Sequence, residues 1–375
     1  MTSDSRAYMA VGLAITLGGL IYAANKWNPY AVIAIFVAAF VACIVLIVRQ
    51  RLLARGKPDK GVNYGKLARI NLLPSAAWIK ENLRGHDRVV DDLVDTIQQE
   101  LSLSHPGKVL SSFLLIGPTG TGKTFLAQLV AQTLYPDSEP LLLRMNQLKH
   151  ADDVFTLIGS PPGRAGYEMG GSLTRPVIEN PYRVVIFDEL DKCHPDLLDC
   201  LYDILDTAQC REKSTGKTVD FSGCVFFGTC NSGVEQVRAA LKQNDTEDVR
   251  ATKIRDALVG TSSFEKSFLA RWTRVEMMDE LKPLNVAEVA LLQLRRYWMD
   301  FGIELTYVAP QLLLEAVEKN EEFRAYGVRQ LSAYIRRQTN QAISQARHAK
   351  VTQVHLDVSP AGDLMVKPVG SAAPR

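Results

Sequence analysis

A glycine-rich loop constrains this 375-residue chain more than any other feature. It stands between an apolar run at 113–116 and a helical pattern that begins at Phe125. Its residues are Gly117, Pro118, Thr119, Gly120, Thr121, Gly122, Lys123 and Thr124. A G-x-x-x-x-G-K-[ST] loop in this context directs backbone N–H groups at phosphate oxygens, while Lys123 reaches the β- and γ-phosphates and Thr124 holds Mg²⁺. The loop therefore predicts a site for a nucleoside triphosphate such as ATP, together with Mg²⁺.

Further apolar runs predict the sheet that would carry this loop. The expected strands lie at 113–116, 141–145, 183–187, 224–229 and 274–277. Because strands and helical patterns alternate, we expect an α/β fold with a parallel sheet and helices on both of its faces. Ligands of such sheets bind at the carboxyl ends of the strands, where the glycine-rich loop is expected.

Two carboxylates follow the third of these runs. The run is apolar enough to be buried on both faces and ends in Asp188 and Glu189. We expect Asp188 to coordinate Mg²⁺ through water and Glu189 to polarise the water that attacks the γ-phosphate. Asn231 ends the next run and is a candidate to hold the same water, although a lone Asn after a strand is more often a turn former.

Two uncharged apolar runs, 8–24 and 30–48, precede these elements. Each is close to the roughly 20 residues of a transmembrane helix, so we expect a membrane hairpin over 1–48, with buried core helices as the alternative. The segment 49–70 is rich in Arg and Lys, whereas Lys26 is the single charge between the runs. The positive-inside rule then places both termini and the nucleotide site in the cytoplasm, with 49–70 as a basic juxtamembrane linker.

The last part of the chain has a different pattern, dominated by helical periodicity and closed by two short strand patterns. We expect a large α/β domain at 71–280, a small helical lid domain at 281–368 and a loose tail at 369–375. The net charge is only +2, and no Lys/Arg cluster of the nucleic-acid-binding type stands out after the linker. This argues against nucleic acid as a partner. The six cysteines form no C-x-x-C pair and no zinc spacing, so they are expected to be ordinary thiols.

Several segments besides the glycine-rich loop are distinctive. They are 157–163 (Leu-Ile-Gly-Ser-Pro-Pro-Gly), 166–171 (Gly-Tyr-Glu-Met-Gly-Gly), 188–195 (Asp-Glu-Leu-Asp-Lys-Cys-His-Pro) and 218–221 (Thr-Val-Asp-Phe). With these segments, residues 83–367 resemble the second ATPase module of ClpB-type Clp/HSP100 proteins, within the AAA+ superfamily. The predicted hairpin lies outside the resemblance.

The resemblance implies roles for further residues. Asn231 becomes the residue that senses the γ-phosphate. Arg271 matches an arginine finger that acts on the neighbouring subunit, and Arg329 matches the nucleotide-sensing arginine of the lid; each would otherwise be taken for a surface salt-bridge partner. Three residues lie where the family's backbone pockets adenine: Arg84, Gly85 and His86. A finger that acts in trans implies a homo-oligomer, and the family's form is a ring of six.

The predicted pore loop departs from the family pattern. It consists of Arg164, Ala165, Gly166 and Tyr167. Family members carry an aromatic and an aliphatic residue at the first two of these places, and these residues grip an unfolded polypeptide. The resemblance also implies a companion arginine before the finger, and Glu265 stands near its place. Residues 235–261 contain no Ile-Gly-Phe/Leu tripeptide for docking a peptidase.

The sequence therefore predicts a membrane-anchored AAA+ ATPase in the inner membrane of a bacterium. It would hydrolyse ATP with Mg²⁺ in a cytoplasmic ring and remodel or unfold protein substrates at the membrane. The alternative is an ATP-gated membrane scaffold or sensor that assembles without threading a polypeptide, which the altered pore loop favours.

Overall fold

The computed structural model describes residues 61–164, 166–242, 244–260, 264–322, 328–359 and 364–369. All of them fall within one compact unit, Pro58–Arg375. The predicted transmembrane runs at 8–24 and 30–48 lie outside the described residues. Within the described part of the chain, no helix is both long enough and apolar enough to cross a membrane. This finding contradicts the prediction of a multi-pass protein in a bacterial inner membrane, and that prediction is withdrawn.

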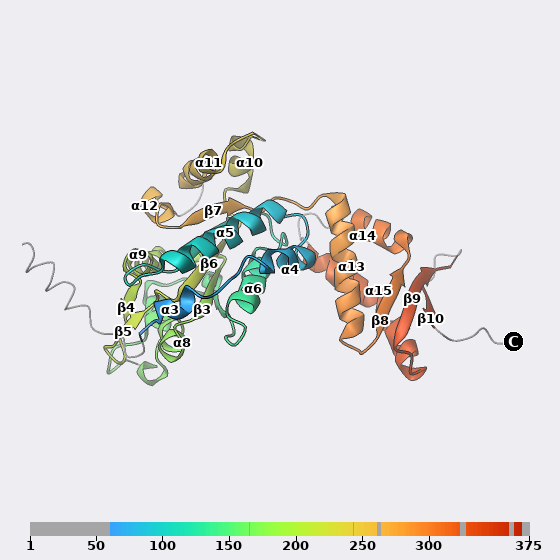
Figure 1. Ribbon diagram of the computed structural model, residues 1–375, viewed down its shortest axis with the longest axis horizontal. Coiled ribbons are helices and arrows are strands. Elements are labelled where there is room, and N and C mark those ends of the chain that lie inside the picture. Colours follow the sequence, from blue (N-terminus) through green and yellow to red (C-terminus); the bar gives the residue numbers. More distant parts are fainter. Residues whose placement is uncertain are drawn as a thin grey trace, which may run out of the picture. The chain divides into compact units, whose positions relative to one another are not determined.

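A parallel sheet forms the centre of the larger part of the fold (Figure 1). Its strands, in the order β2-β3-β6-β1-β7, are β2 (Leu141–Arg144), β3 (Arg183–Asp188), β6 (Cys224–Cys230), β1 (Ser111–Ile116) and β7 (Arg274–Met277). Every neighbouring pair is parallel. The strands fall at the places that the apolar runs predict, and the α/β parallel-sheet fold is confirmed.

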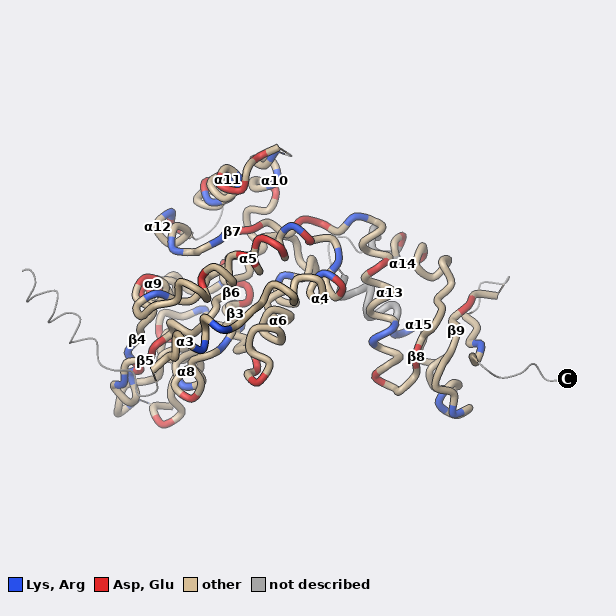
Figure 2. The backbone as a smooth tube through the Cα atoms, viewed as in Figure 1, with Lys and Arg blue, Asp and Glu red and all other residues tan. Residues whose placement is uncertain are grey.

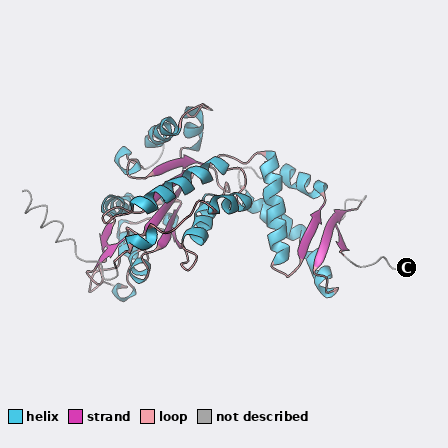
Figure 3. Cartoon of the chain, viewed as in Figure 1, coloured by secondary structure: helices cyan, strands magenta, loops and turns pink. Residues whose placement is uncertain are grey.

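Helices cover both faces of this sheet because the side chains of each strand alternate between two cores (Figure 3). Phe113 and Leu115 of β1 point into a core shared with the helices α4 (Ser75–Asn82), α5 (Asp87–Leu103) and α6 (Lys123–Leu134). Leu114 and Ile116 point into the opposite core, which is shared with α9 (Pro195–Thr207). Each face of the sheet is therefore sealed by its own helical layer.

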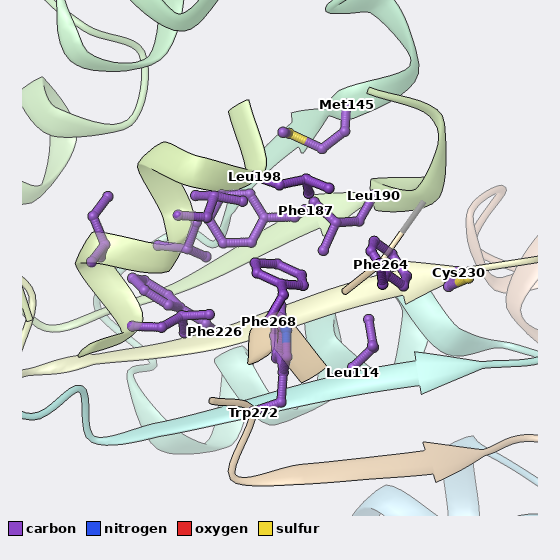
Figure 4. Close-up of a cluster of buried hydrophobic side chains, with 14 of the residues drawn as sticks. Leu114, Met145, Phe187, Leu190, Leu198, Phe226, Cys230, Phe264, Phe268 and Trp272 are labelled. Atoms are coloured by element: carbon purple, nitrogen blue, oxygen red, sulfur yellow. The ribbon is translucent and has the colours of Figure 1, made fainter. Parts of the chain in front are cut away.

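Several large aromatic side chains pack together in the core beneath α9 (Figure 4). Phe187 of β3 and Phe226 of β6 meet edge to face, with ring centroids 5.5 Å apart. Trp272 is fully buried in the same cluster and meets Phe268 edge to face at 5.9 Å. Large rings buried in this geometry contribute more than their area alone. The cluster therefore fixes the segment that carries Arg271 against the sheet.

Short elements connect the layers. The helices and single turns are α3 (Tyr64–Leu67), η1 (Met145–Gln147), η2 (Ala151–Asp153), α7 (Val154–Ile158), η3 (Tyr167–Met169), α8 (Thr174–Glu179), η4 (Leu190–Lys192), α10 (Val234–Ala240), α11 (Glu247–Val259) and α12 (Lys266–Leu269). After α9, the strands β4 (Gln209–Arg211) and β5 (Thr218–Asp220) pair as an antiparallel hairpin. Leu67 of α3 is buried in the core that α5 and α6 share. The end of the predicted linker at 49–70 therefore packs onto the fold.

The elements after β7 form a third, smaller hydrophobic core. Its helices are α13 (Pro283–Met299), α14 (Pro310–Glu322) and α15 (Val328–His348), and its strands are β8 (Glu304–Val308), β9 (Gln353–Val358) and β10 (Leu364–Pro368). They pack around Trp298, Leu294 and Leu356. The sheet order is β10-β9-β8, with β8 parallel to β9. The sequence predicted β9 and β10 but not β8, because its short Glu-Leu-Thr-Tyr-Val run stands between two helical patterns.

Charged residues are distributed over the whole described chain, with basic residues (blue) and acidic residues (red) interspersed (Figure 2). Arg88 of α5 shows the local pattern, because it contacts both Asp92 at 2.6 Å and Glu276 at 3.0 Å. Basic side chains are thus matched locally by acidic ones, in keeping with the net charge of +2.

Candidate functional site

The glycine-rich loop joins β1 to α6 and owes its shape to close backbone approaches. A Cβ atom on Gly117 would lie 2.1 Å from the carbonyl oxygen of Met278, so no larger residue fits. Gly122 has a φ of 97° and caps α6, a conformation that side chains with a Cβ rarely adopt. Lys123 is buried, and its ammonium donates to the carbonyl oxygens of Gly117 at 2.7 Å and Pro118 at 2.8 Å. The loop therefore curls around its own lysine.

Hydroxyl and carboxylate oxygens gather where the carboxyl ends of β3 and β6 meet the start of α6. Oδ1 of Asp188 accepts hydrogen bonds from Thr124 Oγ1 at 2.7 Å and from Thr229 Oγ1 at 2.9 Å. Oxygen ligands of this kind suit Mg²⁺, which is bound through one or two carboxylates, waters and substrate phosphates. The two predicted Mg²⁺ residues, Thr124 and Asp188, are thus brought together, and the donor set fits the ion.

Glu189 follows in an unusual conformation. Its φ is 55°, in the left-handed region, and its backbone N–H donates to Thr229 Oγ1 at 2.9 Å. Its carboxylate accepts a hydrogen bond of 2.6 Å from the Asn146 amide and pairs with the Lys192 ammonium at 3.1 Å. A strained, non-glycine residue held by several partners is typical of a functional position.

A cleft of about 750 Å³ connects these groups. Its walls include the glycine-rich loop, Asp188, Glu189 and Asn231 on the sheet side. On the other side α13 contributes Gln293 and Arg296, and the Arg296 guanidinium lies 5.3 Å from the ring centre of Phe125. The cleft is large enough for a nucleotide and lies between the carboxyl ends of the strands and α13.

Of the three residues predicted at the adenine pocket, Arg84 lines the cleft, whereas Gly85 and His86 do not. The Nε atom of Arg84 is buried without a hydrogen-bond partner among the described residues. Gly85 has a φ of 85°, and a Cβ atom there would lie 2.9 Å from Leu281 Cδ2. His86 is buried and its Nε2 atom lies 3.0 Å from the carbonyl oxygen of Thr121. Burial lowers the pKa of His86, so the imidazole supports the loop in its neutral form.

Arg271 does not line the cleft of its own chain. Its guanidinium lies 3.5 Å from the ring centre of Tyr202, and its Nε atom is 3.3 Å from Asp206 Oδ1. Its Nη1 atom also donates to the carbonyl oxygen of Ser267 at 2.8 Å. The side chain is thus packed on α9 of its own chain. Arg329 lies in α15, but its side chain is outside the described part.

The predicted pore loop is described except at Ala165. Arg164 turns back onto its own chain, where it pairs with Asp152 at 2.5 Å and lies 4.4 Å from the ring centre of Phe155. Gly166, with a φ of 82°, opens the η3 turn. Tyr167 and Met169 of that turn are exposed, with 40% and 73% of their surface accessible. Among the described residues of the η3 turn, Tyr167 and Met169 are thus the exposed apolar side chains, and Tyr167 belongs to the predicted pore loop.

Three residues that contact Asp188 or Glu189 were missed by the sequence analysis: Asn146, Lys192 and Thr229. Asn146 follows β2 as Asn231 follows β6, so a polar residue after a strand was a signal for it. Thr229 is a small polar residue within an otherwise apolar strand, and it bonds to both Asp188 and the Glu189 backbone. Lys192 belongs to the distinctive segment 188–195, but its place three residues after Glu189 was not used to assign it a role.

Comparisons with known proteins agree with this geometry. A family model described as AAA domain (Cdc48 subfamily) matches residues 108–275. The chain is 28% identical to the chaperone protein ClpB of Rhodopirellula baltica over 296 residues, which cover 77% of this chain and 33% of that protein. It is 32% identical to the chaperone protein ClpB of Bacillus cereus over 301 residues, which cover 76% of this chain and 33% of the relative.

The chaperone protein ClpB of Leptolyngbya boryana is 31% identical over 274 residues, with 71% of this chain and 30% of that protein covered. The chain thus spans about a third of the length of these relatives. The domain match, the similarity to Clp/HSP100 proteins and the arrangement of Asp188 and Glu189 at the cleft together identify this chain as an AAA+ ATPase, an enzyme that hydrolyses ATP.

Proposed function

We propose that this ATPase assembles into a ring, hydrolyses ATP with Mg²⁺ at sites shared between subunits, and uses the motion to remodel or unfold protein substrates. The observation that carries the proposal is the position of Arg271. The cleft of one chain contains the phosphate loop, the Mg²⁺ residues and Glu189, whereas Arg271 is packed on α9 outside it. The arginine that matches the family's finger, and that would compensate charge on the transferring phosphoryl group, is therefore not among the residues that line the cleft of its own chain. A neighbouring copy would supply it.

The chemistry follows from the contacts in the cleft. Phosphate oxygens are stronger acceptors than the carbonyl oxygens that now hold Lys123, so its ammonium turns to the β- and γ-phosphates on binding. Thr124, with Asp188 through water, would hold Mg²⁺, which neutralises charge between the phosphates. Glu189 polarises the attacking water, and Asn231 holds that water in line. Glu189 is the nearest carboxylate in sequence to the Mg²⁺ residue Asp188 and projects into the same cleft.

Support for protein remodelling comes from the ClpB relatives and from the exposed η3 turn. Tyr167 and Met169 present an aromatic ring and a thioether to solvent, groups that adapt to many apolar side chains. Such a surface suits an unfolded polypeptide, because it needs no defined sequence in its partner.

One observation favours a second function, an ATP-gated scaffold that assembles without threading a polypeptide. Arg164 is turned back onto Asp152 and Phe155 and does not project as a gripping side chain would. A fluorescent protein that carries an unstructured tag distinguishes the two functions. Unfolding that depends on ATP and is lost in Tyr167→Ala supports remodelling. ATP-dependent assembly with no unfolding in wild type supports the scaffold.

The ATPase assay provides the control for this experiment. Tyr167→Ala leaves the nucleotide cleft intact, so its hydrolysis rate without substrate should equal that of wild type. Glu189→Gln should abolish both hydrolysis and unfolding while ATP binding remains. If wild type and Glu189→Gln hydrolyse ATP equally slowly, the proposed role of Glu189 is wrong.

A further inference from the structure

The backbone on both sides of Asn231 is held by other segments of the chain. Before it, the carbonyl oxygen of Cys230 accepts a hydrogen bond of 3.2 Å from the N–H of Gly117, the first residue of the glycine-rich loop. After it, Ser232 donates twice to Oδ2 of Asp191, from its backbone N–H at 3.1 Å and from its hydroxyl at 2.5 Å. The residue expected to hold the attacking water is therefore fixed from two directions.

Asp191 belongs to the short turn η4, two residues after Glu189. The turn is anchored at Leu190, whose side chain is fully buried in the core beneath α9. Lys192 closes the turn by donating its N–H to the carbonyl oxygen of Glu189 at 3.0 Å. The Asp191 carboxylate thus extends from an anchored part of the chain and holds Ser232 in a defined place.

The contact between Asp191 and Ser232 does not belong to a local turn, in which an Asp side chain bonds to backbone only a few residues away. The two residues are 41 positions apart and meet because β3 and β6 are neighbours in the sheet. A hydroxyl that donates to a carboxylate forms a charge-assisted hydrogen bond, roughly twice as strong as a neutral one. The pair therefore joins the chain after β3, which carries Glu189, to the chain after β6, which carries Asn231.

The described residues that line the nucleotide cleft include Glu189 and Asn231 but neither Asp191 nor Ser232. Asp191 is therefore placed to affect hydrolysis through groups that face the nucleotide, and not by contact with the nucleotide itself. The position of such groups matters, because a displacement of about 1 Å in an active site can slow a reaction about a hundredfold.

We propose that Asp191 is a positioning residue for ATP hydrolysis, which fixes Asn231 by binding Ser232. Without the two hydrogen bonds, the chain after β6 keeps its attachment to the glycine-rich loop but loses the second one. The Asn231 amide then no longer has a defined place relative to Glu189. The inference rests on the proposed role of Asn231 in holding the attacking water.

A double-mutant cycle on the full chain tests the proposal, with kcat for ATP hydrolysis as the measured quantity. Asp191→Ala should lower kcat about ten- to a hundredfold while KM for ATP stays within about twofold, because the phosphate contacts of the cleft are unchanged. In the Asn231→Ala background the same change should lower kcat by less than about twofold, since the residue that it displaces is already absent. An equal loss in both backgrounds, or a raised KM with unchanged kcat, would overturn the proposal.

Two milder variants keep the test independent of folding. Asp191→Asn keeps the shape of the side chain and an acceptor oxygen but loses the charge, so it should lower kcat less than Asp191→Ala does. Ser232→Ala removes the hydroxyl bond alone and should lower kcat about two- to tenfold with unchanged KM. Asp199→Asn, which changes an exposed carboxylate of α9 outside the cleft, is the matched control and should hydrolyse ATP at the wild-type rate. Wild-type kcat in both Asp191→Asn and Ser232→Ala would overturn the proposal even where Asp191→Ala does not fold.

Asn231→Ala by itself separates failure of the inference from failure of the role on which it rests. If this variant hydrolyses ATP at the wild-type rate, Asn231 has no part in hydrolysis, and both the role and the inference are wrong. If it is slow and Asp191→Ala causes the same further loss as in wild type, the role stands and the inference is wrong. Protein remodelling is tested separately, by the unfolding assay.

Discussion

The side-chain amide of Asn146 donates a hydrogen bond of 2.6 Å to Oε2 of Glu189. The two residues are 43 positions apart in the chain and meet because β2 and β3 are neighbours in the sheet. The hydrogen bond orients the carboxylate and occupies one of its oxygens, so this contact restrains the residue proposed to polarise the attacking water.

Replacing the amide should therefore release Glu189. We expect Asn146→Ala to raise the ATPase rate without substrate by about two- to tenfold, the range set by loss of one solvent-exposed hydrogen bond of about 0.5–1.5 kcal/mol. Phosphate release under saturating ATP measures the rate. Gln147→Ala, the next residue and also part of the cleft wall, is the control and should leave the rate unchanged. A rate in Asn146→Ala that falls to the level of Glu189→Gln would mean that Asn146 positions the carboxylate for catalysis.

Mixing two inactive variants tests whether the site is shared between chains. Glu189→Gln keeps its arginine, and Arg271→Ala keeps its carboxylate, so each alone should lose at least about a hundredfold in ATPase rate. In a mixed ring, the cleft of an Arg271→Ala chain keeps its own Glu189. A neighbouring Glu189→Gln chain supplies the missing Arg271, so this shared site is complete. The mixture should therefore regain activity as the ratio of the two variants approaches one. Activity that stays at the level of the separate variants at every ratio would place Arg271 in the site of its own chain.

Gly117 should tolerate no side chain. Its added Cβ atom would lie 2.1 Å from the carbonyl oxygen of Met278, and both atoms belong to the backbone of packed elements. We expect Gly117→Ala to lower the free energy of unfolding by about 2 kcal/mol or more and to weaken ATP binding. Urea titration and nucleotide titration measure the two effects.

Gly65→Ala is the matched control. In α3 the added methyl group would have the flexible Asn63 side chain as its nearest contact, at 3.3 Å. Alanine is favoured over glycine in a helix by roughly 0.8–1.0 kcal/mol, so the change should be neutral or mildly stabilising. Equal losses of stability in Gly65→Ala and Gly117→Ala would show that the approach to Met278 is not what excludes a side chain.

Asp92 gives the fold a dependence on pH. Burial raises the pKa of Asp92 from 3.8 to about 6, Arg88 opposes this shift, and the neighbouring Glu247 carboxyl adds to it. The folded chain therefore binds this proton more tightly than the unfolded chain. Its contribution to the free energy of unfolding is present below pH 3.8 and is lost as the pH rises to about 6.

Urea unfolding between about pH 4 and pH 7 measures this effect, because the folded-state pKa of Asp92, about 6, lies within this range. The difference in unfolding free energy between wild type and Asp92→Asn should shift against wild type as the pH rises through the window. Glu100→Gln, on the same helix and paired with Lys108 on the surface, is the control and should show a much smaller dependence. A difference that is constant with pH would contradict the raised pKa.

Much of the fold was predictable because its signals are local. The five apolar runs correspond to β1, β2, β3, β6 and β7, and strands buried on both faces have continuous apolar sequences that need no knowledge of the partner strand. The glycine-rich loop and the Asp188-Glu189 pair were likewise visible, since each motif is contiguous in the chain. β8 was missed because its Glu-Leu-Thr-Tyr-Val run mixes polar and apolar residues and stands between two helical patterns.

The sequence by itself determined that the chain has a phosphate-binding loop, an acidic pair after a buried strand and an α/β sheet to carry them. Only the tertiary structure decided which polar residues meet there. Asn146 reaches Glu189, and Thr229 reaches Asp188, because the sheet order β2-β3-β6-β1-β7 places strands side by side that are far apart in sequence. Contiguous motifs are encoded by spacing along the chain, whereas contacts across a sheet depend on strand order, which spacing does not specify.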